Sequence, residues 1–249
     1  MKAFKLFIAS GLAFAAMTVA HAEPLNYEVK VVYWDDTEFR GSFDYDADTQ
    51  KVTNLQGLLD DTLMGNIEEI RYQLHTTGDG KGGITAYAFA MNTTEIDTNP
   101  PVNNNVAVAI NFNAIDPVLG PTDPDQLAYM DCSPGGLMGQ TCMYHLSWHD
   151  PVYPMEGGHG ILSETITAAG GQLSRSDCLL NWAENSYPNM FSPAQAASQS
   201  SSPYYYRFYP NTNLYMGISA EDSHVYYLEQ GADLRDVGHL ADWLALAGC

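Results

Sequence analysis

The chain has 249 residues, of which 45% are hydrophobic and 16% are charged, with 30 acidic residues against 10 basic ones and a formal net charge of −20. This length and apolar content allow one or two domains with a sizeable core. So negative a chain repels phosphate backbones and anionic lipid, which excludes nucleic acid as a partner and favours a solvated surface or divalent cations.

Residues 1–22 have the pattern of a secretory signal peptide. A basic start is followed by the apolar run Leu6–Ala20 and by the small residues of Ala20-His-Ala22. That run is shorter than the roughly 20 residues of a membrane span, and an uncleaved anchor is the alternative. No later run approaches spanning length. We therefore expect cleavage after Ala22 and an exported protein, periplasmic or extracellular, without a membrane span.

Residues 23–166 are predicted to form a mainly β domain, either a β-sandwich or an open barrel. Short runs rich in β-branched and aromatic residues alternate there with Gly, Asp and Asn turns. The runs are Tyr27–Trp34, Gly41–Tyr45, Lys51–Leu55, Ile70–Leu74, Ile84–Ala90, Val106–Phe112 and Cys142–Trp148. The segment Leu58–Glu69 is compatible with a strand or with a short helix.

Residues 177–249 are predicted to form an α+β module after a small, polar, glycine-rich linker at 167–176. A helix capped by Ser176 covers Asp177–Glu184, and a second helix covers Asp236–Leu246. Between them, three strand-favouring runs separated by turn residues form an antiparallel meander. The runs are Tyr204–Tyr209, Leu214–Ile218 and Val225–Leu228.

Four cysteines in an exported chain are expected to be oxidised, and four cysteines allow three pairings. We expect Cys132 to pair with Cys142 and Cys178 with Cys249, because each pair then lies within one compositional block. The second bridge would join the first helix of the C-terminal module to the last residue of the chain.

Several motifs resemble those of exported bacterial proteins. The runs Asp177–Pro188 and Tyr204–Pro210, together with Tyr215-Met-Gly217, His224-Val-Tyr226 and Gly248-Cys249, resemble a small disulfide-closed module found at the ends of diverse secreted bacterial proteins. The runs Gly41–Asp46, Val52–Leu55, Leu127–Cys132 and Gly139–Met143 are similar to a family of uncharacterised exported bacterial proteins. The resemblance implies a bacterial, exported protein of two parts, and it carries no catalytic residues with it.

The segment Asp131–Gly160 concentrates thioether and imidazole side chains. Met143 and His145 lie two residues apart in a predicted strand, about 7 Å along it, and His159 follows a Gly-Gly turn. Such ligands suit copper, and imidazoles also suit zinc. Met143, His145 and His159 are therefore a candidate metal site. The alternative is a strand and loop pinned by a disulfide, with histidines on the surface.

Asp44, Asp46 and Asp48 alternate as in a calcium-binding loop. The frame of an EF-hand fails, because its sixth position is Thr49 instead of Gly and its twelfth is Leu55 instead of Glu. An acidic hairpin turn is the favoured interpretation, and calcium stands beside copper as a candidate cofactor.

No catalytic residue is assigned. The chain has no Gly-x-Ser-x-Gly elbow and no His-Glu-x-x-His motif. Cysteines in disulfides are not available as nucleophiles. Two carboxylates could be brought together by folding as in glycoside hydrolases, but a sequence does not show their separation.

The meander carries aromatic residues on both faces. Because side chains alternate along a strand, Tyr205, Arg207 and Tyr209 are expected on the face opposite to Tyr204, Tyr206 and Phe208. We expect the second set to meet the helices and the first to form a candidate ligand platform. The favoured function is an exported binding or structural protein with a glycan or protein partner. The alternatives are a copper-binding protein that uses the segment 138–159 and a carbohydrate-active hydrolase.

Overall fold

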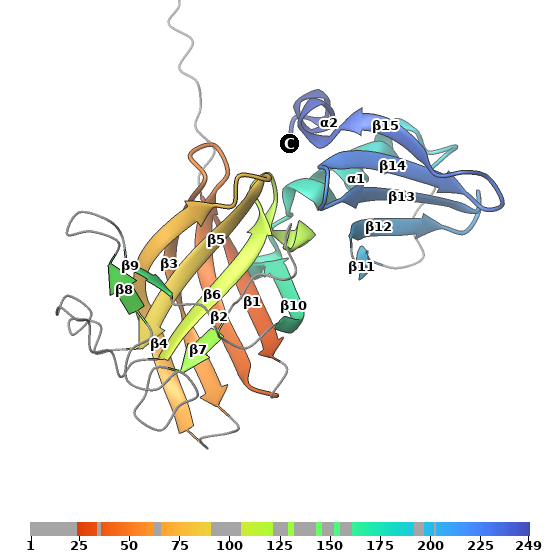
Figure 1. The fold of residues 1–249 in the computed structure, drawn as a ribbon. Coiled ribbons are helices and arrows are strands. Elements are labelled where there is room, and N and C mark those ends of the chain that lie inside the picture. Colours follow the sequence, from red (N-terminus) through yellow and green to blue (C-terminus); the bar gives the residue numbers. More distant parts are fainter. Residues whose placement is uncertain are drawn as a thin grey trace, which may run out of the picture.

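The computed structural model describes residues 24–33, 36–61, 66–90, 106–121, 129–131, 143–145, 152–154, 161–191, 197–201 and 203–249. The predicted leader at 1–22 lies outside these residues. The described residues form an eight-stranded sheet, a five-stranded sheet and a two-stranded hairpin, with helices in the C-terminal module (Figure 1). The predicted class, mainly β with an α+β C-terminal module, is confirmed.

The large sheet is antiparallel and open, with strand order β10-β1-β2-β3-β4-β5-β6-β7. Its strands are β1 (Leu25–Tyr33), β2 (Glu38–Asp46), β3 (Lys51–Asp61), β4 (Asn66–Gly78), β5 (Gly83–Ala90), β6 (Val106–Asn113), β7 (Tyr129–Asp131) and β10 (Ile161–Ala168). Consecutive strands are neighbours, except that β10 returns to pair with β1. The described ends of the ambiguous segment Leu58–Glu69 are strand: residues 58–61 end β3 and residues 66–69 begin β4. The separate hairpin consists of β8 (Met143–His145) and β9 (Val152–Pro154).

A pair of glycines makes room for a buried ring on the large sheet. Gly41 and Gly57 lie opposite each other on β2 and β3, and the ring of Phe39 covers both. A Cβ atom at Gly41 would lie 2.5 Å from Phe39 Cζ, and one at Gly57 would lie 2.8 Å from Phe39 Cε2. Because any side chain at either position would displace this fully buried ring, glycine is required there.

The acidic segment around Asp46 is a hairpin turn, as the EF-hand mismatch indicated. It connects β2 to β3, and Asp46 Oδ1 accepts hydrogen bonds from the amides of Asp48 and Thr49 at 2.9 and 3.1 Å. The neighbouring Asp44 accepts hydrogen bonds from the side chains of Asn26 and Asn54. These oxygens therefore stabilise the turn and its flanking strands.

The C-terminal sheet has the order β11-β12-β13-β14-β15 and is antiparallel throughout. Its strands are β11 (Gln199–Ser201), β12 (Tyr204–Tyr209), β13 (Leu214–Ser219), β14 (His224–Glu229) and β15 (Arg235–His239). The three central strands are those predicted from the aromatic runs. The short edge strands β11 and β15 extend the meander on both sides.

Both predicted helices are present, but their first residues differ from the prediction. Helix α1 (Arg175–Ser186) is capped by Ser174, whose side chain accepts a hydrogen bond from the amide of Asp177, so the cap predicted at Ser176 is wrong. The predicted linker at 167–176 contains the end of β10, the turn η3 (Ala169–Gly171) and the first turn of α1.

Helix α2 (Leu240–Ala247) begins four residues later than predicted, because β15 occupies the preceding residues. Those residues pair with β14 on both sides of a bulge, which shifts the register between Val225 and Tyr226. Gly238, beside this bulge, has a φ of 113°, which favours glycine. Strand pairing therefore overrides the helical spacing of Val237 and Leu240.

Helices α1 and α2 pack on one face of the C-terminal sheet, and the core between them includes Leu179, Leu240 and Leu244. The short helix η2 (Pro117–Leu119), which follows β6 of the large sheet, contributes Leu119 to this same core. The two sheets are thus joined through a shared apolar contact. No helix in the described part of the chain is long and apolar enough to cross a membrane.

The predicted bridge between Cys178 and Cys249 is present and joins α1 to the end of the chain. The other predicted pair, Cys132 with Cys142, lies outside the described residues. Substitution of Cys178 by Ser is expected to lower the free energy of unfolding by about 4 kcal/mol, since the bridge spans a sequence separation of 71. Amide hydrogen exchange should show the loss of protection in α1 and β13. An equal loss in β5 of the large sheet would contradict this local effect.

Candidate functional site

The two faces of β12 are the reverse of those expected. Arg207 is only 9% exposed and Tyr209 is fully buried, and both belong to the face that the helices cover. Tyr205 also packs against the core of this module. The predicted platform of Tyr205, Arg207 and Tyr209 is therefore wrong as an exposed surface, and the alternate residues of β12 face away from the helices.

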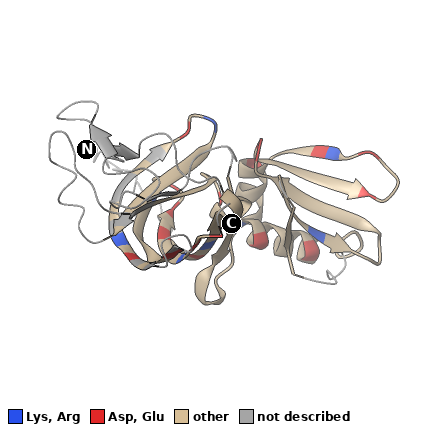
Figure 2. Ribbon diagram, turned by 60° about the horizontal axis from the view of Figure 1, so that its bottom comes forward, with Lys and Arg blue, Asp and Glu red and all other residues tan. Residues whose placement is uncertain are grey.

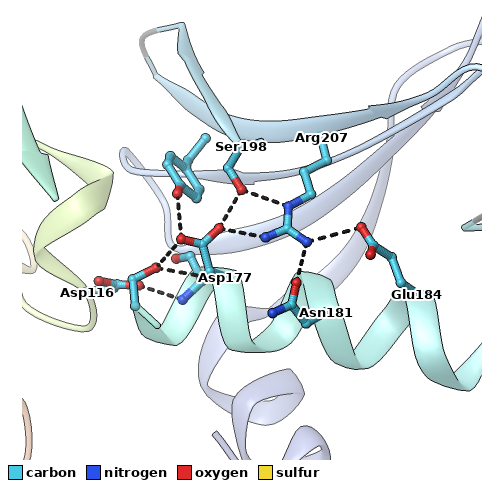
Figure 3. A network of polar contacts seen from close by, with 9 residues as sticks. Asp116, Asp177, Asn181, Glu184, Ser198 and Arg207 are labelled. Carbon is cyan, nitrogen blue, oxygen red and sulfur yellow. Dashed lines mark hydrogen bonds and ion pairs between the residues drawn. The ribbon is translucent and has the colours of Figure 1, made fainter. Parts of the chain in front are cut away.

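Arg207 faces inward because α1 supplies partners for its guanidinium (Figure 3). Nη2 donates to Asp177 Oδ1 at 2.9 Å, and Nη1 donates to Glu184 Oε1 at 3.1 Å and to Asn181 Oδ1 at 2.5 Å. Nε donates to Ser198 Oγ at 2.8 Å. All three nitrogens of the buried guanidinium are thus paired, which a buried charge requires.

Asp177 is the centre of this network. Its Oδ1 also accepts from Ser198, and its Oδ2 accepts from the hydroxyls of Tyr205 at 3.0 Å and Ser174 at 3.1 Å. Burial acts to lower the pKa of Arg207, but the carboxylates of Glu184 and Asp177 outweigh it and raise that pKa above its usual range. Because both oxygens of Asp177 are already engaged, the network acts as a clamp between α1 and β12.

Asp116 ties the large sheet to the start of α1. Its Oδ2 accepts from the amide of Ser176 at 2.6 Å, and its Oδ1 accepts from the amide of Val118 at 3.3 Å. Asp116 is completely buried, and burial raises the pKa of its carboxyl to about 6, although the bonds from Ser176 and Val118 act to lower it. Nearby, Asn113 Nδ2 donates to Ala220 O and Ser223 Oγ, both at 3.0 Å. Polar bonds therefore fix the orientation of the two sheets.

A cleft of about 590 Å³ lies at this junction, between β10, η2 and the clamp. Glu164 lines it from β10, opposite the buried Val31 of β1. The Oε2 atom of Glu164 accepts weakly from the amide of Asn111 at 3.4 Å, while its Oε1 is buried without a hydrogen-bond partner among the described residues. Burial raises the pKa of Glu164 to about 8. This carboxyl is consequently protonated at neutral pH.

The face of the C-terminal sheet turned away from the helices carries a layer of half-buried rings. We call it the tyrosine face, and it consists of Tyr204, Tyr206, Phe208, Tyr215 and Tyr226. The ring of Tyr215 lies 4.5 Å from that of Phe208 and 6.0 Å from that of Tyr206. Tyr204 and Tyr226 are in edge contact at 5.8 Å. The rings thus form a nearly continuous aromatic layer across three strands.

Gly217 lies within this aromatic layer and leaves space for its rings. It lies opposite both Tyr206 and Tyr226, and a Cβ atom there would lie 3.0 Å from the Cβ of Tyr206. A larger residue would therefore press on the Cβ of Tyr206 and require the two strands to shift. Because glycine has no side chain, it leaves room for the neighbouring rings of Tyr206 and Tyr226 on this face.

Acidic side chains lie beside the tyrosine face at its β14–β15 side. Tyr226 donates its hydroxyl to Asp222 Oδ2 at 2.6 Å, a bond that raises the pKa of Tyr226. His224 Nδ1 lies 2.8 Å from Asp236, whose pKa is lowered by a hydrogen bond from the amide of Gly238 and by His224. The rim therefore combines fixed carboxylates, an imidazole and hydroxyls around apolar rings.

The predicted metal ligands are not placed by this structure. Met143 and His145 belong to β8, but their side chains lie outside the described residues, as does His159. Among the residues that are described, no cluster of His, Cys, Asp or Glu is arranged to hold a metal ion. The copper and calcium hypotheses therefore stay predictions.

The clamp around Arg207 was missed by sequence reasoning, although a signal for it exists. Asp177, Asn181 and Glu184 recur at helical spacing and therefore share one face of α1. A polar stripe on the helix and a lone arginine in an aromatic strand form a complementary pair. The buried carboxyls of Asp116 and Glu164 have no such signal, because their burial depends on contacts between distant segments.

No family model matches the chain, and neither the curated proteins nor the solved structures contain a protein that matches it.

Proposed function

We propose that this protein is a non-catalytic binding protein that acts outside the cytoplasm, and that its tyrosine face stacks on neutral, polyhydroxylated ligands such as the sugar rings of a glycan. The observation that carries the proposal is the layer of five half-buried rings on the face of the C-terminal sheet that is turned away from the helices. Aromatic rings offer a flat apolar surface, and their hydroxyls fix the orientation of a bound polar group.

The charges around the tyrosine face disfavour an anionic ligand. Asp222 and Asp236 lie at its rim, and the chain carries a net charge of −20. An anionic polymer would be repelled by this field, whereas carboxylates accept hydrogen bonds from sugar hydroxyls. Extracellular action is supported by the bridge between Cys178 and Cys249, because disulfides persist in oxidising compartments.

The experiment measures binding of the full mature chain to soluble neutral polysaccharides, namely glucans, mannans and xylan, with anionic alginate as a charge control. Substitution of Tyr206 or Tyr215 by Leu keeps apolar area but removes a ring. Each change is expected to weaken glycan affinity up to roughly tenfold, which corresponds to about 1.4 kcal/mol. The thermal midpoint should change little, since both rings are partly exposed.

The matched control is Tyr205→Phe, which removes a hydroxyl from the covered face of the same strand. It should leave glycan affinity unchanged. Equal affinity of the wild type, Tyr206→Leu and Tyr215→Leu would refute the proposed face, and preferential binding of alginate would refute the neutral ligand class.

A further inference from the structure

A second aromatic site lies on the opposite side of the C-terminal sheet, between the sheet and the two helices. It is a cavity of about 180 Å³, and its lining combines methionine, valine and alanine residues with the aromatic residues Trp182, Tyr187, Phe191, Tyr226, Tyr227 and Trp243. None of the described residues that line it is charged. An apolar cavity of about 150 Å³ accommodates benzene, so this one accepts a compact group of comparable size.

The cavity is reachable from solvent, and its rings are held in place. Tyr187 at its rim is 46% exposed, and Met190 is 44% exposed. Trp243 Nε1 donates to Val237 O at 3.0 Å, and the ring of Trp182 meets that of Trp243 edge to face at 6.2 Å. A ligand therefore enters a largely formed aromatic wall, which lowers the entropic cost of binding.

The electrostatics of the site favour a cation. The faces of indole and phenol rings attract positive charge, and tryptophan does so most strongly. At Tyr227 this attraction already serves Arg235, whose Cζ lies 5.5 Å from the ring centre and whose Nη1 donates to the Tyr227 hydroxyl at 2.9 Å, so a ligand cation would depend on the other rings of the lining. Figure 2 shows acidic residues on both sheets and few basic ones, in keeping with the net charge of −20. This field raises the local concentration of cations.

The lining also selects the kind of cation. A primary ammonium carries three N–H donors that need acceptors, and no carboxylate among the described residues lines the cavity to accept them. A quaternary ammonium has no N–H group, and its methyl groups suit an apolar wall. We propose that this cavity binds the quaternary ammonium group of a small soluble compound. It shares Tyr226 with the tyrosine face, whose other four residues do not line it.

The test compares two probes of the same shape on the full mature chain. Choline carries the charge, and 3,3-dimethylbutan-1-ol replaces its nitrogen by carbon. Calorimetric titration is expected to show a preference of about 3- to 30-fold for choline, the range that a cation–π contribution provides. Equal or tighter binding of the alcohol, or no saturable binding of choline, would overturn the proposal.

Variants locate the site. Trp243→Leu and Tyr187→Leu are each expected to reduce choline affinity about fivefold, because each removes one ring. Tyr187 is exposed, so its variant remains informative if Trp243→Leu fails to fold. Tyr206→Leu, on the tyrosine face, is the control and should keep wild-type choline affinity. Unchanged affinity in the Tyr187 and Trp243 variants would show that the cavity is not the site.

Discussion

Replacing Arg207 by Met is expected to lower the free energy of unfolding by about 3–5 kcal/mol, the usual cost of removing one partner from a buried ion pair. The side chain of Arg207 is 10% exposed, and its ion partners Asp177 and Glu184 are each 23% exposed. Without the guanidinium, the carboxylate of Asp177 loses its main counter-ion. Urea denaturation of the full chain, followed by circular dichroism, measures the change.

Arg40→Met is the matched control for this experiment. Arg40 also forms an ion pair, with Glu38, but its side chain is 68% exposed. Exposed pairs contribute little, so the control should change stability by less than about 1 kcal/mol. Similar losses in the two variants would mean that burial of the Arg207 network has no special energetic role.

Replacing Glu164 by Gln is expected to remove most of the alkaline loss of stability above pH 6. In the folded protein the pKa of Glu164 is about 8, against an ordinary value of 4.5. The folded state therefore binds a proton between these pH values that the unfolded state has released, so stability is full below pH 4.5 and falls as pH rises through 8. The wild type should lose about 5 kcal/mol over this whole interval, of which about 3 kcal/mol falls above pH 6.

The measurement is the thermal midpoint of wild type and Glu164→Gln from pH 5 to pH 9. As pH rises, the thermal midpoint of the variant should fall less than that of the wild type. At pH 9 the variant should have the higher midpoint. Asp116, with a pKa of about 6, makes stability depend on pH mainly below pH 6. The change in stability above pH 6 therefore reports on Glu164. Glu28→Gln, an exposed carboxyl on β1, should keep the wild-type profile. Parallel profiles for wild type and Glu164→Gln would contradict the assignment.

The C-terminal module offers two different aromatic surfaces on one sheet. The tyrosine face is broad and rimmed by carboxylates, whereas the cavity behind the sheet is compact and has no charged lining residue among those described. The clamp around Arg207 holds β12 against α1 and thereby fixes the sheet that carries both surfaces relative to this helix. Loss of glycan binding and loss of choline binding are therefore expected from different variants.

Local patterns in the sequence determined much of the architecture. The aromatic runs of β12, β13 and β14 have strand-favouring residues and polar turns, and these properties act over a few neighbouring residues. The Gly-rich turn before β5 and the acidic turn before β3 predicted hairpins for the same reason. The bridge of Cys178 to Cys249 was also anticipated, because both cysteines lie in one compositional block.

Tertiary structure alone decided which face of β12 is covered. Alternation divides Tyr205, Arg207 and Tyr209 from their neighbours, but it does not say which set meets the helices. That choice follows from the clamp, since only the inward position gives Arg207 the carboxylates of α1. Likewise, the raised pKa of Glu164 depends on tertiary structure. Strand β10 returns beside β1 and brings this carboxyl to Asn111 of β6, which lies 53 residues away in the chain.

Pairing of β15 with β14 overrode a helical pattern because the hydrogen bonds of a neighbouring strand outweigh local propensity.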